Sequence, residues 1–181
     1  MDTTVKFYSL DYRESRTYLY AALFLIGNIV LPQLIHLLPH GGLIWLPIYF
    51  FTLIGAYKYG WQVGLLTAVA SPLVNHGLFG MPAAPMLVPI LVKSVVLVLV
   101  VSYAAHRYQK VSVPVLAAVV LAYQAIGSAA EWMIVGNPIA ALQDFRIGIP
   151  GMMLQLFGGY ATIKYLLKTT QIGRASCRER V

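Results

Sequence analysis

Several side chains with binding or reactive chemistry stand inside long apolar stretches of this chain. They include the ammonium group of Lys93, the carboxylate of Glu131 and the imidazoles of His36 and His76. Such groups can bind a charged solute, hold a metal ion or transfer a proton, and each is costly to bury without a partner. Their apolar surroundings therefore make them the first candidates for a functional site.

The composition indicates what kind of protein holds these groups. Hydrophobic residues make up 59% of the 181 residues and charged residues only 10%, whereas a soluble domain has about 25% charged residues. The mean hydropathy is +0.74. We therefore expect an integral membrane protein, in which the formal charge of +7 is typical of cytoplasmic loops and does not indicate a nucleic-acid partner.

Six apolar segments predict an all-α membrane protein with six transmembrane helices. A helix needs roughly 20 residues to cross a bilayer, and the turns between these segments are short and rich in Gly and Pro. We expect residues 1–16 to form a cytoplasmic lead-in and residues 17–171 to form one transmembrane domain. The six segments are residues 17–38, 43–57, 61–79, 86–105, 113–135 and 151–167.

The distribution of positive charge predicts the orientation, because Lys and Arg concentrate in cytoplasmic loops. If the six helices alternate in direction, one side holds eight Lys or Arg residues and the opposite side holds only Arg146. Both termini are therefore expected in the cytoplasm. The eight residues are Lys6, Arg13, Arg16, Lys58, Arg107, Lys110, Lys164 and Lys168.

The polar residues inside the segments share a similar depth. At 1.5 Å per residue, Lys93 lies about 11 Å inside its helix, and the others also fall in the outer half of the bilayer. The inner halves are almost uniformly Leu, Val, Ile, Ala and Tyr. This pattern predicts a polar pocket that opens outward, not a continuous channel. The candidate substrate-binding residues are Lys93, Glu131, Asn75, His76, His36, Gln155, Trp132, Gln124, Asp144 and Arg146.

Simpler interpretations stay open for the ionisable residues. Lys93 and Glu131 can form a purely structural ion pair, since two buried opposite charges cost less than one alone. Each imidazole can hydrogen-bond a neighbouring backbone carbonyl. A metal site of His36, His76 and Glu131 is a minor alternative, because no HxxxH or HExxH spacing exists. We expect neither a metal ion nor a cofactor.

The aromatic and loop residues on the outer side also allow two interpretations. Trp45, Tyr49 and Trp132 lie where an aromatic belt is expected, and Trp132 can alternatively stack on a ligand. Asp144 and Arg146 are either solvated loop charges or part of the pocket mouth, where loops commonly contact a ligand.

Small residues recur at every fourth position of the third segment, at Gly60, Gly64 and Ala68. Such a face lets helix backbones approach closely. It either packs the bundle internally or docks a partner membrane protein.

The last ten residues, "IGRASCRERV" (172–181), differ in character from the rest. They contain the single cysteine, three Arg and one Glu. We interpret them as a non-native tail, because they are the in-frame translation of a common sequencing-library adapter. Without the three Arg and one Glu, the net charge falls from +7 to +5.

Two stretches, "LPQLIHLLPHGGLIWLPIYFFTLIGAYKYGWQVGLLTAVASPLVN" and "ALQDFRIGIPGMMLQLFGGY", resemble uncharacterised bacterial members of a transporter family. Over nearly all of residues 1–171, the chain is similar to the substrate-binding S component of an energy-coupling factor (ECF) vitamin transporter. The resemblance implies a binder of a vitamin-like micronutrient in the bacterial inner membrane. It also implies partners, namely a transmembrane T component and two cytoplasmic ATPases.

The resemblance implies a docking surface as well. Family members often dock the T component through AxxxA on the first helix, a spacing that "YAALFLIGN" lacks, so the Gly60, Gly64 and Ala68 face is the substitute. The chain has no GxxxxGK[ST] ATP-binding loop, so active transport needs energy from a partner or a gradient. The alternatives are a non-transporting scaffold of the cell envelope and, less favoured, an intramembrane enzyme using His36, His76 and Glu131.

Overall fold

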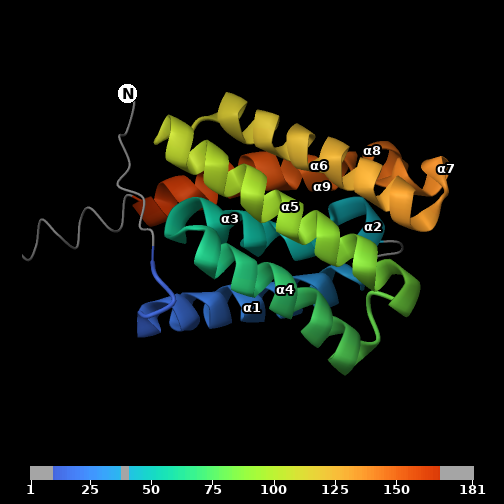
Figure 1. Cartoon of the computed structure of the whole chain (residues 1–181), viewed down its shortest axis with the longest axis horizontal. Coiled ribbons are helices and arrows are strands. Elements are labelled where there is room, and N and C mark those ends of the chain that lie inside the picture. The colour runs from blue at the N-terminus through green and yellow to red at the C-terminus, as the bar shows by residue number, and fades with distance from the viewer. Residues whose placement is uncertain (1–9, 38–40, 168–181) are drawn as a thin grey trace, which may run out of the picture.

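The computed structural model describes residues 10–37 and 41–167, and its helices run mostly along the long axis of the molecule (Figure 1). Residues 1–9 of the expected lead-in and the expected adapter-derived tail, 172–181, lie outside the described residues. Every regular element in the described part is helical. The expectation of an all-α protein is therefore confirmed.

Four long helices correspond closely to predicted segments. They are α1 (Ser15–Ile35), α4 (Trp61–Phe79), α5 (Ala84–Tyr108) and α6 (Val113–Val135). Among the described residues, three of them, α1, α5 and α6, are long and apolar enough to cross a bilayer. The chain is therefore a membrane protein with transmembrane helices.

The second predicted segment, 43–57, is not one helix. It is divided into α2 (Gly41–Trp45), the short 3-10 helix η1 (Pro47–Tyr49) and α3 (Phe50–Tyr59). The break falls at Leu46, whose φ of 46° lies in the left-handed region, and Pro47 follows without a backbone N–H to continue the helix. The prediction of a continuous helix here is wrong, and the break places α2 across one end of the bundle.

The last segment is also interrupted. The long loop before it contains α7 (Pro138–Ala141) and α8 (Gln143–Ile147), and the chain then enters α9 (Ile149–Met153). A π-helical turn, η2 (Leu154–Gly158), follows before α-helix resumes over residues 159–167. Such π turns inside helices frequently mark functional sites.

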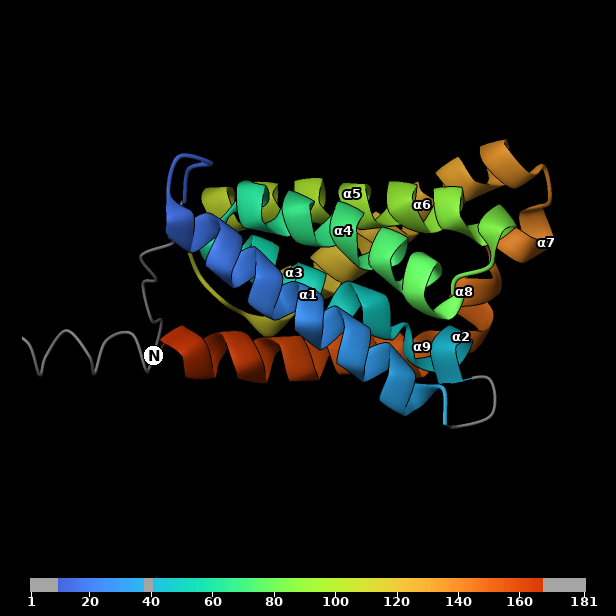
Figure 2. The same ribbon diagram turned by 90° about the horizontal axis from the view of Figure 1, so that it is seen from below.

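The core surrounds α3, every residue of which from Thr52 to Tyr59 is buried. The last helix runs along one side of the bundle and α4 with α5 along the other (Figure 2). Gly64 lies at the contact of α4 with α3, since a Cβ there would come within 2.6 Å of the Ala56 Cβ. Ala68 is fully buried, and Gly60 forms the α3–α4 turn with φ 99°. Gly64 and Ala68 therefore pack inside the bundle, whereas Gly60 is partly exposed.

The two ends of the bundle are built differently. At one, here called the proximal end, the lead-in meets the α3–α4 turn through a hydrogen bond from Leu10 N to Tyr59 O. Tyr57 Oη donates to Lys110 O, and Lys58 Nζ donates to Leu166 O at 2.5 Å. Lys58 was expected in a loop, but it is 3% exposed in the last turn of α3. The opposite, distal end contains α2, α7 and α8.

Candidate functional site

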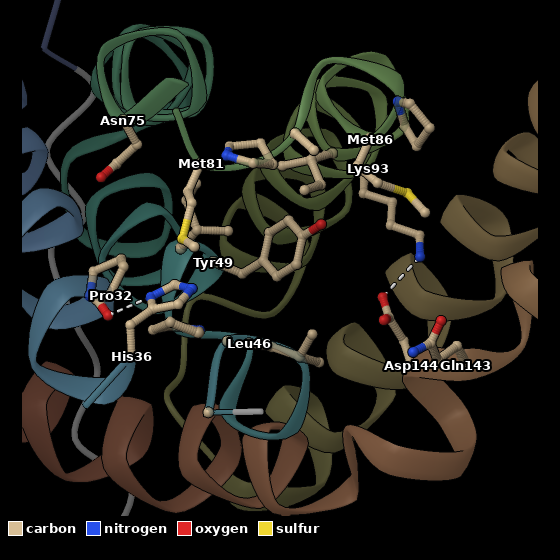
Figure 3. A pocket seen from close by; sticks show the side chains of 18 of the residues that line it. Pro32, His36, Leu46, Tyr49, Asn75, Met81, Met86, Lys93, Gln143 and Asp144 are labelled. Atoms are coloured by element: carbon tan, nitrogen blue, oxygen red, sulfur yellow. Dashed lines mark hydrogen bonds and ion pairs between the residues drawn. The ribbon is translucent and has the colours of Figure 1, made fainter. Parts of the chain in front are cut away.

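A cavity of about 490 Å³ opens at the distal end. Its walls come from the end of α1, the α2–η1 segment, the α4–α5 connection, the first turns of α5, the end of α6 and α8 (Figure 3). The volume lies in the range of small-molecule sites. Of the predicted site residues, the cavity brings together His36, Asn75, Lys93, Glu131 and Asp144.

Three charged side chains form the polar wall of this cavity. Lys93 Nζ pairs with Glu131 Oε2 and, at 2.7 Å, with Asp144 Oδ2. The side chains of Lys93, Glu131 and Asp144 are 3%, 8% and 14% exposed. The predicted Lys93–Glu131 pair is present, and Asp144 joins it from the loop. One ammonium group is therefore shared by two carboxylates in a largely desolvated site.

A glycine on α6 makes room for the side chain of Lys93 in this charged cluster. Gly127 lies one turn before Glu131 on α6, and a Cβ there would come within 2.7 Å of the Lys93 Cγ. The glycine thus makes room for the lysine stem between α5 and α6. Asp144 is in the first turn of α8, whose bounds fall within the predicted loop. Arg146, on the same short helix, is exposed and does not line the cavity.

A neutral polar network supports the cavity from α1, α3 and α4. Asn28 Nδ2 donates to Thr52 Oγ1 at 2.9 Å and to Ser71 Oγ at 3.0 Å. Asn75 Nδ2 donates to Asn28 O at 3.0 Å and Ser71 O at 2.9 Å. Both amide hydrogens of Asn75 are thereby used. Its Oδ1 is buried behind the cavity wall and has no hydrogen-bond partner among the described residues.

This network corrects the predicted depth pattern. Asn28 lies in the middle of α1, and Thr52 and Thr67 lie on α3 and α4, all fully buried. Polar side chains therefore reach beyond the outer half of the bundle. They were missed because one amide or hydroxyl in an apolar helix is a weak signal, and only the fold shows that several of them meet.

The two histidines match the simpler interpretation given to each. His36 Nδ1 lies 2.6 Å from Pro32 O, and His76 Nδ1 lies 2.7 Å from Pro82 O. His36 also lines the cavity, whereas His76 does not. No three His, Cys, Asp or Glu side chains in the described part of the chain are grouped as metal ligands. The alternative of a metal site built from His36, His76 and Glu131 therefore has no geometric support.

Three other predicted site residues lie outside the cavity. Gln124 is fully buried, and neither its Oε1 nor its Nε2 has a partner among the described residues. Gln155, in the π turn, accepts a hydrogen bond from Tyr123 Oη at 2.7 Å. Trp132 is 54% exposed, as expected of a residue in an aromatic belt.

The cavity is also lined by residues that the sequence analysis assigned to another role or did not identify. Tyr49 was expected in the aromatic belt, but it is 2% exposed and lines the cavity, so that assignment is wrong. Met81, Met86 and Gln143 were not considered, although they also line it. For Tyr49 the one signal in the sequence was Pro47, which marks the break after which the chain turns back into the bundle.

Comparison of the chain with protein-family models, with characterised proteins and with solved structures gave no match. The function is therefore argued from the geometry of the site.

Proposed function

We propose that this chain is a membrane-embedded substrate-binding subunit of an ECF-type uptake transporter. In this proposal it captures a vitamin-like micronutrient at the outer face of the bacterial inner membrane. The observation that carries the proposal is the cavity of about 490 Å³ with a buried charged cluster in its wall. A cavity that is mostly apolar with a few converging polar groups is the usual form of a small-molecule site.

The direction of the helices supports a six-span topology with both termini in the cytoplasm. The Tyr59–Trp61 turn, the α5–α6 connection and the last helical turns gather at the proximal end. That end also carries most of the positive charge, and the cavity is at the other. Under the positive-inside rule, the cavity then opens away from the cytoplasm. The π turn and the α2–α3 break would lie inside the bundle, where neighbouring helices can satisfy irregular backbone.

The closed proximal end supports a carrier in preference to a channel. Tyr57, Lys58 and Leu10 make contacts across it, and the buried core around α3 separates it from the cavity. This packed core lies between a solute bound at the distal end and the proximal end. Release would therefore need a change of orientation or shape. In this proposal, a T component and two cytoplasmic ATPases drive that change.

The first test is to purify residues 1–171 gently in detergent and to identify bound small molecules by native mass spectrometry. We expect a stoichiometric solute that is lost from Glu131→Gln but retained by Lys164→Ala. Lys164 is an exposed lysine near the proximal end, so it controls for loss of a charge far from the cavity. Size-exclusion chromatography establishes that each variant is folded.

An empty, folded preparation that also binds nothing from a panel of vitamins would contradict the proposal. That result would favour the scaffold alternative, because a scaffold needs no buried charges at a cavity wall.

A further inference from the structure

We propose that the solute is an organic cation, with N–H donors on its charged group and a flat, largely apolar body. This inference rests on the proposed binding function and adds the charge and shape of the solute. It follows from three features of the cavity: the sign of its charge, the chemistry of its unpartnered polar atoms and the nature of its remaining wall.

The cavity wall carries excess negative charge. Its charged residues are Lys93, Glu131 and Asp144, which sum to one negative charge when His36 and Tyr49 are neutral. Arg146, the nearest other cation in sequence, is exposed and outside the cavity. A carboxylate that is mostly desolvated is stabilised by an opposite charge. Lys93 supplies one such charge for two carboxylates, so a bound cation would complete the balance.

The charged cluster leaves two carboxylate oxygens as open hydrogen-bond acceptors. Lys93 Nζ pairs with Oε2 of Glu131 and Oδ2 of Asp144. No described residue donates a hydrogen bond to Glu131 Oε1 or Asp144 Oδ1, and neither atom is fully buried. Lys93 keeps one N–H. A solute that presents several donors therefore fits these atoms better than one that presents acceptors.

The rest of the wall fits an aromatic body. Tyr49, Met81 and Met86 line the cavity together with Pro89 and Ile90. In Figure 3 the labelled side chain of Tyr49 lies between His36 and Lys93, and that of Met81 lies next to His36. Methionine sulfur and aromatic rings make favourable contacts, and a tyrosine face attracts a delocalised cation. This wall would hold a flat ring while the charged group reaches the carboxylates.

The test uses three ligands that share one ring system and differ in charge: 2-naphthamidine, 2-naphthamide and 2-naphthoate. Their binding to residues 1–171 in detergent is measured by isothermal titration calorimetry. We expect the amidine to bind at least about tenfold more tightly than the amide, since hydrogen bonds to charged groups are about twice as strong as neutral ones. We expect the naphthoate to bind most weakly.

Two substitutions on α8 test whether the preference for the amidine comes from the carboxylate in the cavity wall. Asp144→Asn should weaken amidine binding about tenfold and change amide binding less than twofold, because it removes the charge and keeps the shape. Arg146→Gln, on the same helix but outside the cavity, should change neither. Glu131→Gln provides a second charge removal on α6 if the Asp144 variant does not fold.

The outcomes separate this inference from the proposed function. Naphthamide or naphthoate binding as tightly as the amidine, or a co-purified solute that is anionic, would overturn the cation inference while leaving a solute-binding protein. Failure of all three ligands and of the vitamin panel, with no co-purified solute, would overturn both.

Discussion

At the scale of single residues, Lys93 is the group on which the charged cluster depends. Its ammonium lies between two carboxylates and is 3% exposed. Removing one member of a buried ion pair usually costs several kcal/mol, because the remaining charge stays desolvated. Here the loss of Lys93 would leave two carboxylates facing one another, so the cluster has a structural role in addition to the binding role proposed for it.

We predict that Lys93→Met lowers the free energy of unfolding by about 3 kcal/mol. The double variant Lys93→Met/Glu131→Gln should recover part of this loss, because only Asp144 then keeps a charge. Thermal unfolding in detergent measures both. Equal stability of Lys93→Met and the unchanged protein would show that the carboxylates are protonated or hydrated without the lysine.

Gln124 is a buried polar residue whose side chain costs stability, because it lacks hydrogen-bond partners among the described residues. Its amide is fully buried on α6, and both polar atoms are without partners among the described residues. An unsatisfied buried group costs about 1–3 kcal/mol, and leucine has a similar volume. We predict that Gln124→Leu raises the free energy of unfolding by about 1 kcal/mol and leaves solute binding unchanged. Loss of binding in a folded Gln124→Leu variant would return this residue to the site.

Tyr123→Phe is the matched control for that substitution. It removes the hydrogen bond from Tyr123 Oη to Gln155 Oε1, so it should lower the free energy of unfolding by about 1 kcal/mol. Opposite signs for the two variants would show that satisfaction of hydrogen bonds, and not polarity alone, decides stability at this depth.

At the scale of elements, the cavity depends on how closely α2 and α9 approach. Gly151 makes that approach possible, because a Cβ there would lie 2.5 Å from the Trp45 backbone carbonyl carbon and 2.6 Å from its oxygen. Backbone atoms cannot move aside without shifting α2. Since Gly41, Gly42 and the Leu46 break line the cavity, any shift of α2 changes its shape.

We therefore predict that Gly151→Ala lowers the free energy of unfolding by about 2 kcal/mol and weakens solute binding at least tenfold. Gly77→Ala is the control, because a Cβ at that position in α4 would meet no atom within 4 Å. Alanine is favoured over glycine inside a helix by up to about 1 kcal/mol, so the control should be neutral or stabilising. Wild-type affinity in Gly151→Ala would show that α2 does not form the site.

The sequence predicted the helix ends where a glycine or proline marks them, and it missed an end where neither gives a clear signal. The ends of α4 and α6 were predicted well because Gly80 and Gly136 adopt left-handed C-caps, with φ of 66° and 71°. The α2–α3 break was missed because its left-handed residue is Leu46, which carries no such local signal. Only Pro47 marked the position, and proline is also compatible with a kinked continuous helix.

The site was predicted in part for the same reason. Lys93 and Glu131 could be paired by counting depth along two helices, since helix geometry fixes the rise per residue. Asp144 could not be paired, because its place depends on how a loop of more than ten residues folds into α7 and α8. Asn28 and Asn75 meet only through the packing of α1 on α4, which no local pattern encodes.

At the scale of the whole molecule, the two ends have opposite character. The proximal end carries Lys or Arg residues from the lead-in, α3, α5 and the last helix, and it is held by the contacts of Tyr57 and Lys58. The distal end carries the cavity and its excess negative charge. Such polarity predicts that the proximal end faces the cytoplasm, because cytoplasmic loops retain positive charge.

The final prediction is that the two ends lie on opposite sides of the membrane. Ile139 on α7 is 68% exposed and Tyr108 at the end of α5 is 56% exposed. We expect Ile139→Cys in intact cells to react with a membrane-impermeant maleimide, and Tyr108→Cys to react only after the membrane is made permeable. Both variants are made in residues 1–171, which contain no native cysteine.

This measurement tests the topology independently of any ligand. Labelling of Tyr108→Cys alone in intact cells would show that the orientation is the reverse of the one predicted. Labelling of both positions would show that the two ends are not on opposite sides of the membrane. The expected pattern would place the carboxylates of Glu131 and Asp144 within reach of external solutes. It would also place the positively charged end where cytoplasmic partners can reach it. Under the proposed function, the packed core around α3 lies between the captured solute and the proximal end, so release requires a movement of the bundle.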